Sequence, residues 1–144
     1  MTKMIFVNLP VADVAASTAF YEAIGMEKDL RFSNEQASAM QWSDTISFMI
    51  LHRDFYATFT SKQIADARKT SEVLLCLSQD SRAAVDAITE AALAAGGKEP
   101  RDPQDMGFMY GRSFEDLDGH IFEPMFMDMD AAMAAMAPAE AADA

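Results

Sequence analysis

The chain has 144 residues, of which 51% are apolar, and its formal net charge is −12. This length suits one compact domain or two small fused modules, and the apolar share is enough for a core. The acidic charge argues against partners that are polyanions, such as nucleic acid or an anionic membrane surface. A single cysteine, Cys76, excludes an intrachain disulfide, and the N-terminus lacks a signal-peptide pattern, so we expect a cytoplasmic protein.

The first half of the chain predicts a strand, a helix and three more strands. The apolar run from Met4 to Leu9 is typical of a strand. Asp13 offers an N-cap for the helix that follows, and Gly25 is suited to end it. Turn residues then separate three strand-like runs, at 26–32, 36–42 and 45–51. The order is βαβββ.

The second half repeats this order. The apolar run Val73 to Leu77 precedes a cap at Asp80 or Ser81, and Gly96 ends the second helix. Strand-like runs follow at 98–103, 107–115 and 120–127. Two such units in one chain form an internal repeat. We therefore predict an α+β fold of two βαβββ modules, whose eight strands form a curved sheet around a pocket.

The repeat also divides the chain. We expect a first module at residues 1–52, a connecting segment at 53–70, a second module at 71–127 and an Ala/Met-rich acidic tail at 128–144. In the tail, a helix is expected over 129–136 and a frayed end after Pro138.

The connecting segment combines aromatic residues with a helix-start pattern. Thr60 and Gln63 fit a capping box, which predicts a short helix over Ser61 to Ala67. Phe55, Tyr56 and Phe59 precede it. These aromatic residues either form a lid over a pocket or pin the segment to the core.

Two motifs resemble a known superfamily. Leu9-Pro10-Val11 and Asp13, before a helix that contains Phe20-Tyr21, resemble the opening of glyoxalase and bleomycin-resistance modules. Phe114 to Glu123, with its Asp-Leu-Asp-Gly turn, resembles their closing strand. The likeness to this vicinal-oxygen-chelate superfamily covers about residues 4–127, and the stretch 104–112 resembles a branch related to lactoylglutathione lyase. It implies a small-molecule pocket, a homodimer and, in the metalloenzymes, one divalent ion.

The resemblance places the family's metal ligands on four strand positions. Glu123, four residues after Gly119, matches the ligand of the closing strand. Glu72 falls at the ligand position that opens the second module. In the first module the positions fall on Phe6 and near Met49, which do not suit a divalent ion of this kind. Asn8 and His52 are auxiliary candidates, two residues along the first strand and at the end of the fourth.

The two retained carboxylates leave three alternatives open. In the first, they bind a divalent metal ion. Because both donors are oxygens, Mg²⁺ or Mn²⁺ is a better candidate than Ni²⁺ or Zn²⁺. Alternatively, Glu72 and Glu123 form a metal-free acid pair, in which repulsion raises one pKa and creates a general base. In the third alternative, Glu72 is a solvated residue at a strand start and only Glu123 points inward.

Two functions follow from these alternatives. The first is a lyase-like or dioxygenase-like enzyme with Glu123 and Glu72 as catalytic residues. The second is a metal-free protein that binds or sequesters a small molecule, as bleomycin-resistance proteins do. Trp42, Phe55 and Tyr56 would then contact the ligand, and Arg112 would either grip an anionic group or form a salt bridge. Pairing of modules within one chain or between two chains stays open.

Overall fold

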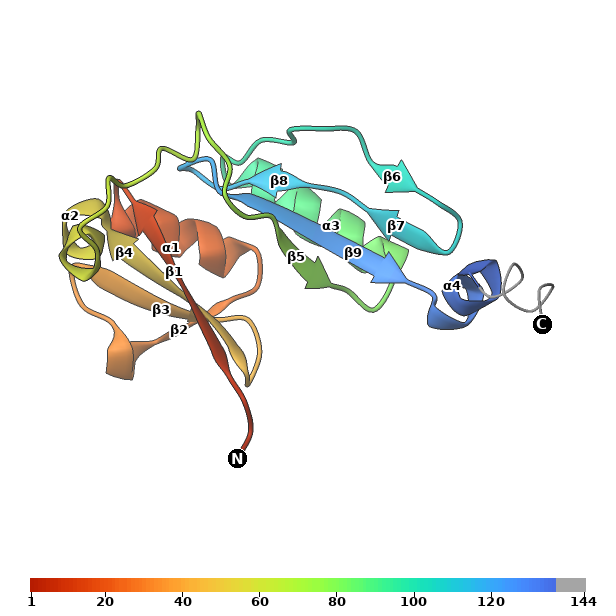
Figure 1. The fold of residues 1–144 in the computed structure, drawn as a ribbon, viewed down its shortest axis with the longest axis horizontal. Helices are drawn as coiled ribbons and strands as arrows, with labels where there is room; N and C mark the ends of the chain where they lie inside the picture. The colour runs from red at the N-terminus through yellow and green to blue at the C-terminus, as the bar shows by residue number, and fades with distance from the viewer. Residues whose placement is uncertain (137–144) are drawn as a thin grey trace.

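The computed structural model of the chain describes residues 1–136. The first module contains one sheet of four strands in the order β1-β4-β3-β2 (Figure 1). β1 runs parallel to β4, and the other pairs are antiparallel. The elements are β1 (Ile5–Val11), α1 (Val14–Ala23), β2 (Glu27–Asp29), η1 (Leu30–Phe32), β3 (Ala37–Gln41) and β4 (Ile46–His52).

The second module repeats this arrangement in a sheet of five strands. Its order is β5-β9-β7-β6, with β8 paired to β9, and β5 runs parallel to β9. The elements are β5 (Leu75–Ser78), α3 (Arg82–Ala94), β6 (Gln104–Asp105), β7 (Met109–Gly111), β8 (Phe114–Glu115), β9 (Ile121–Met127) and α4 (Met129–Met136). The predicted α+β fold of two modules is confirmed, and its strands lie in two separate sheets.

The two major helices start and end as the repeat predicts. The Asp13 carboxylate accepts a hydrogen bond from the Ala16 amide at 3.0 Å, and the Ser81 hydroxyl does the same for Ala84 at 3.0 Å. Gly25 follows α1 and Gly96 follows α3, with φ of +103° and +104°. Among the described residues, no helix is long and apolar enough to cross a membrane.

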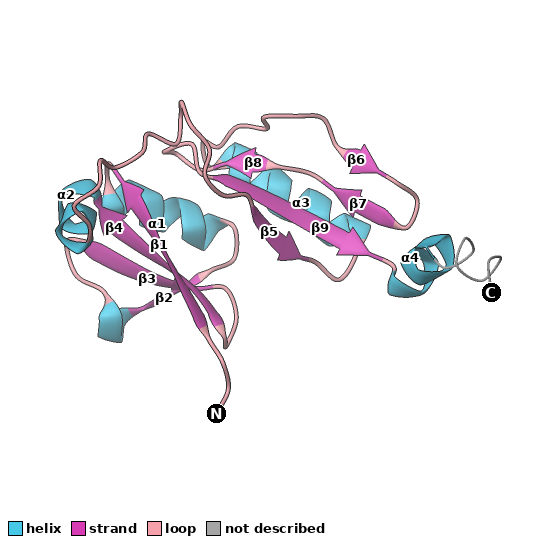
Figure 2. Ribbon diagram, viewed as in Figure 1, coloured by secondary structure: helices cyan, strands magenta, loops and turns pink. Residues whose placement is uncertain are grey.

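One apolar core holds both modules together. Phe122 of β9 is fully buried, and its ring lies 5.7 Å from Tyr21 of α1, 5.4 Å from Phe48 of β4 and 5.4 Å from Phe114 of β8. α1 and α3 cover the same side of the two sheets (Figure 2). The helical residues Arg53–Tyr56 contact β1 and β4 as well. Burial of each such ring stabilises the fold by about 1.5–3 kcal/mol. Because rings of both modules form this core, a single module would expose part of it.

Polar contacts reinforce this core at residues 116–120, which we name the closing turn. Asp116 accepts hydrogen bonds from the Tyr21 hydroxyl at 2.5 Å and from the His120 amide at 2.8 Å. Asp118 accepts a hydrogen bond at 2.9 Å from the amide of Ala12, a residue that lies just before α1. Burial raises the pKa values of both Asp116 and Tyr21. The closing turn of the second module thus holds the helix start of the first.

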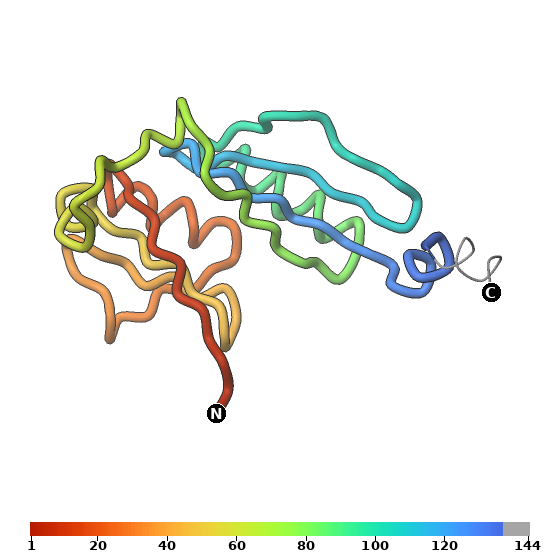
Figure 3. The backbone as a smooth tube through the Cα atoms, viewed as in Figure 1, coloured from red at the N-terminus to blue at the C-terminus, as the bar shows by residue number. Residues whose placement is uncertain are grey.

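The connecting segment departs from its prediction. Its helical residues are α2 (Arg53–Tyr56) and η2 (Ala57–Phe59), and the predicted helix at 61–67 is absent. Instead, the Arg53 guanidinium donates to the Ile64 and Ala65 carbonyls, at 3.4 Å each, and so ties this stretch to α2. Figure 3 shows this segment passing from one module to the other.

Two predicted strands are also shorter than expected. The run 26–32 ends its strand at Asp29, whose carboxylate accepts the Arg31 amide and caps η1. The run 98–103 keeps only a bridge between Lys98 and Glu115, because prolines at 100 and 103 lack the N–H groups of a ladder. The predicted helix at 129–136 is α4, and Pro138 lies outside the described residues.

Candidate functional site

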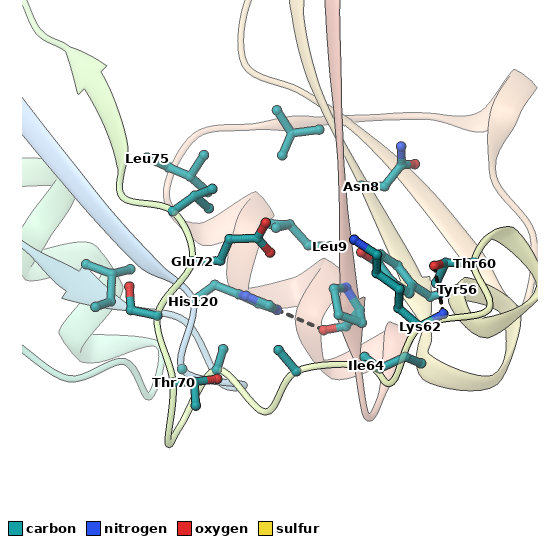
Figure 4. Close-up of a pocket in the computed structure, with 18 of the residues that line it drawn as sticks. Asn8, Leu9, Tyr56, Thr60, Lys62, Ile64, Thr70, Glu72, Leu75 and His120 are labelled. Carbon is teal, nitrogen blue, oxygen red and sulfur yellow. Dashed lines mark hydrogen bonds between the residues drawn. The ribbon is translucent and has the colours of Figure 1, made fainter.

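A cavity of about 380 Å³ lies between the two modules (Figure 4). We name it the inter-module cavity. β1 forms one wall, the segment leading into β5 forms the opposite wall, and the connecting segment and the closing turn complete it. It is lined by residues 7–10, 56, 60, 62–65, 67, 70–73, 75 and 119–121.

A second cavity of about 220 Å³ adjoins the first. Both share Asn8, Tyr56 and Thr60, and the second adds Leu51 and Phe59. Phe59 packs edge-to-face against Phe55, with ring centroids 5.1 Å apart, which steadies this aromatic wall. The aromatic residues of the connecting segment thus lie beside a cavity and line part of it.

The connecting segment is tied down where it passes the second module. Arg68 donates to the Leu117 carbonyl at 2.8 Å. Gly119 has φ of +96°, and a Cβ atom there would lie 2.8 Å from backbone atoms of Ala67 and Arg68. Only glycine permits both this backbone conformation and this approach. The closing turn therefore fixes one wall of the inter-module cavity.

His120 and Glu72 both line this cavity. His120 Nε2 lies 2.8 Å from the Pro10 carbonyl, which can only accept, so Nε2 carries a proton. This hydrogen bond joins the closing turn to β1 across the cleft. Glu72 is exposed and, among the described residues, takes part in no ion pair. Figure 4 shows the two side chains entering the cavity from its second-module side.

The structure does not bring Glu72 and Glu123 together. Glu123 faces Cys76 across the β5–β9 ladder, whereas Glu72 lies in a bend three residues before β5. Glu123 lies outside the cavity lining and forms an ion pair with Arg101 at 2.5 Å. Burial and the charge of Glu123 raise the pKa of the Cys76 thiol, which disfavours the reactive thiolate. Of the two predicted catalytic carboxylates, Glu72 lines the inter-module cavity and Glu123 does not.

Other predicted site residues lie elsewhere. Phe6 and Met49 do not line either cavity, and Phe6 is 55% exposed. Trp42 packs against the apolar core. His52 caps α2 by accepting the Asp54 amide on Nδ1 at 3.2 Å. Of the residues predicted to bind a ligand, the structure places Asn8 and Tyr56 in both cavities.

Arg112 forms salt bridges, one of its two predicted roles. Its guanidinium binds three carboxylates, those of Asp86 at 3.1 Å, Glu90 at 2.8 Å and Glu99 at 2.9 Å. These hydrogen bonds raise the pKa of Arg112. Glu123 is not among its partners. With its donors occupied and its side chain 10% exposed, Arg112 ties α3 to the strands of the second module.

The residues present do not fit a divalent metal. Across residues 1–136, no three His, Cys, Asp or Glu side chains cluster closely enough to hold an ion. Phe6 and Met49 stand at two of the four family positions, and the two carboxylates at the others lie apart. A catalytic zinc ion usually takes three protein donors, and a magnesium ion usually takes one or two carboxylates together with water or substrate.

Sequence reasoning did not identify Lys62, Gln63 and His120 as cavity residues. Their place depends on the backbone contact between Gly119 and Ala67, which joins residues far apart in sequence. A glycine before a strand indicates a turn but does not show which segment packs against it.

Comparison with known proteins agrees with this fold. Residues 3–123 match the family model described as the glyoxalase/bleomycin resistance protein/dioxygenase superfamily. No curated protein sequence matches the chain.

Several solved structures resemble this chain over most of their length. A hypothetical protein from S. aureus is 23% identical, with a TM-score of 0.74 and coverage of 88% of this chain and 94% of that one. A glyoxalase-related enzyme from Fulvimarina pelagi is 21% identical, with a TM-score of 0.74 and coverage of 88% of each chain. At these identities the likeness shows the fold, while the family model covers most of the sequence. The chain belongs to the glyoxalase/bleomycin resistance protein/dioxygenase superfamily.

Proposed function

We propose that this protein binds a small molecule in the inter-module cavity without a resident metal. The cavity itself is the observation that carries the proposal. Its volume of about 380 Å³ falls in the range of small-molecule sites, and it lies between two structural units, where such sites are common.

The lining supports a ligand with both polar and apolar parts. Tyr56, Ile64 and Leu75 offer apolar surface, while Asn8 and Glu72 offer hydrogen-bonding groups. A few polar groups among apolar walls fix a ligand's orientation, and the apolar walls supply most of its affinity. Metal-free binding or sequestration, one of the two functions predicted from sequence, agrees with this lining.

Metal analysis and a ligand screen test the proposal. Protein purified without a chelator should contain less than about one divalent ion per ten chains, because two of the four metal-ligand positions lack donors. Compounds that raise the melting temperature should lose their effect in Ala67→Trp, which places a large side chain in the cavity lining. Glu123→Gln, outside the lining, is the matched control and should bind normally. A stoichiometric ion lost in Glu123→Gln would overturn the proposal.

A metal-free lyase-like enzyme is the second candidate. It is supported by Glu72 and His120, which line the same cavity and could move a proton. An enzyme of this kind would exchange an acidic C–H proton of a bound ligand with solvent in D₂O. Glu72→Gln should abolish that exchange. A ligand that binds without any proton exchange would exclude the lyase-like enzyme and support a binding protein.

We also propose that the protein forms a homodimer. Four apolar side chains near the cleft are at least half exposed. Ile5 and Phe6 lie on β1, and Val73 and Leu74 lie just before β5. A second copy would cover them, since monomers rarely expose contiguous apolar surface. Light scattering should give twice the chain mass, and Phe6→Ser with Leu74→Ser should give the single mass. A monomer at all concentrations would contradict this.

A further inference from the structure

Two opposite charges, those of Lys62 and Glu72, line the inter-module cavity. Neither Lys62 nor Glu72 forms an ion pair within the part of the chain that the structure describes. Arg82, Arg101 and Arg112 each bind a carboxylate at 3.1 Å or less. The cation and the anion of the cavity are thus available to charges that a ligand brings.

The two charges stand on opposite walls. Glu72 belongs to the segment that enters β5, on the second-module side (Figure 4). Lys62 belongs to the connecting segment beside β1, where its amide donates to the Thr60 hydroxyl at 3.1 Å. This hydrogen bond fixes the Lys62 backbone. The cavity is therefore positive toward the first module and negative toward the second.

Neighbouring groups extend the same polarity. Beside Lys62, the Asn8 amide and the Tyr56 hydroxyl can donate hydrogen bonds, and Figure 4 shows both on the β1 side. Beside Glu72, the Nε2 proton of His120 is held by the Pro10 carbonyl. One end of the cavity thus offers donors to an anion, and the carboxylate of Glu72 at the other end offers acceptors to a cation.

We propose that the cavity binds a linear zwitterion, with its carboxylate toward Lys62 and its ammonium toward Glu72. This inference rests on the proposed function and names the ligand class. A simple amine or a simple carboxylate would leave one cavity charge partly desolvated and unpaired, which costs affinity. A zwitterion of the right length pairs both charges and joins the two modules through the ligand.

Calorimetry with ω-amino acids of increasing chain length tests the inference. One length should bind best and should bind about 10-fold or more tightly than the alkylamine and the alkanoate of equal length. Lys62→Gln and Glu72→Gln should each weaken that ligand about 10-fold or more. The matched controls Lys69→Gln and Glu35→Gln, exposed and outside the cavity, should bind as the parent does. Lys62→Glu combined with Glu72→Lys should recover binding to within a few-fold, with the ligand reversed.

The outcomes separate this inference from the proposed function. Equal binding of the amine, the carboxylate and the zwitterion would overturn the inference but support a small-molecule site. No binding by any ω-amino acid would also overturn it, and the ligand screen with Ala67→Trp would then decide the proposed function alone. Failure of the double variant to recover binding would contradict the assignment of the two charges.

Discussion

The closing turn and the inter-module cavity adjoin each other, yet they differ in whether their charged side chains have partners within the protein. In the closing turn, the carboxylates of Asp116 and Asp118 accept hydrogen bonds from the first module and from their own backbone. In the cavity, Lys62 and Glu72 form no ion pair among the described residues. The hydrogen-bonded carboxylates stabilise the contact between the two modules, and the exposed charges of Lys62 and Glu72 can pair with charges on a ligand.

The residues that carry the family resemblance are not the residues that line the cavity with free charge. The Asp-Leu-Asp-Gly motif that resembles the superfamily builds the joint, since its carboxylates hold Tyr21 and Ala12. The residues with free charge lie in the connecting segment and the entry to β5, outside any motif. A family motif therefore predicts this fold better than it predicts the ligand.

The largest expected effect concerns the core that underlies the joint. Phe122→Ala removes a ring that contacts Tyr21, Phe48 and Phe114, and it should lower the free energy of unfolding by about 3–5 kcal/mol. Phe59→Ala, at a residue 68% exposed, should cost less than about 1 kcal/mol. Urea denaturation measures both. Separate unfolding of the two modules in the parent protein would contradict a shared core.

Gly119 should come next, because it combines left-handed backbone with close packing. Gly119→Ala should cost about 2–4 kcal/mol through the clash with the backbone of Ala67 and Arg68 and the unfavourable φ. Gly107→Ala is the matched control, since φ is +83° and no atom lies within 4 Å of the added Cβ. It should cost about 1 kcal/mol. Equal losses in the two variants would show that the connecting segment does not pack on the closing turn.

Tyr21 should make stability fall at alkaline pH. Its pKa is raised in the folded state above the ordinary value of 10.0, chiefly by burial and then by Asp116. Above pH 10 the unfolded chain loses this proton while the folded chain keeps it, so stability present below pH 10 is lost as pH rises. Tyr21→Phe should cost about 1–3 kcal/mol at pH 7. It should also reduce the alkaline slope by about 1.4 kcal/mol per pH unit. Denaturant curves between pH 7 and 11 measure this, and an unchanged slope would contradict it.

The smallest effect should come from the cavity charges. Lys62→Gln and Glu72→Gln should each change the free energy of unfolding by less than about 0.5 kcal/mol, because neither residue stabilises the fold through an ion pair. Thermal or urea denaturation without ligand checks this. A loss above about 1 kcal/mol in either variant would show that these residues serve the fold and would weaken the comparison with the closing turn.

Local patterns made much of the fold predictable. Asp13, Ser81, Gly25 and Gly96 act within a few residues of themselves, so their roles could be read from the sequence. The helix expected at 61–67 is absent, and Arg53 instead holds the Ile64 and Ala65 carbonyls, a contact between residues eleven and twelve positions apart that local propensity does not include. The same limit applied to Glu72, which lies in a bend before β5 that the apolar run at 73–77 did not indicate.

Backbone NMR of the protein titrated with a ligand from the screen tests the central claim most directly. If the inter-module cavity is the site, the largest amide shifts should fall on Asn8, Lys62, Glu72 and His120. The amides of Met49, Cys76 and Glu123, which lie outside the lining of both cavities, should change little. The largest shifts on Cys76 and Glu123, with none at Lys62 or His120, would contradict a site in the inter-module cavity.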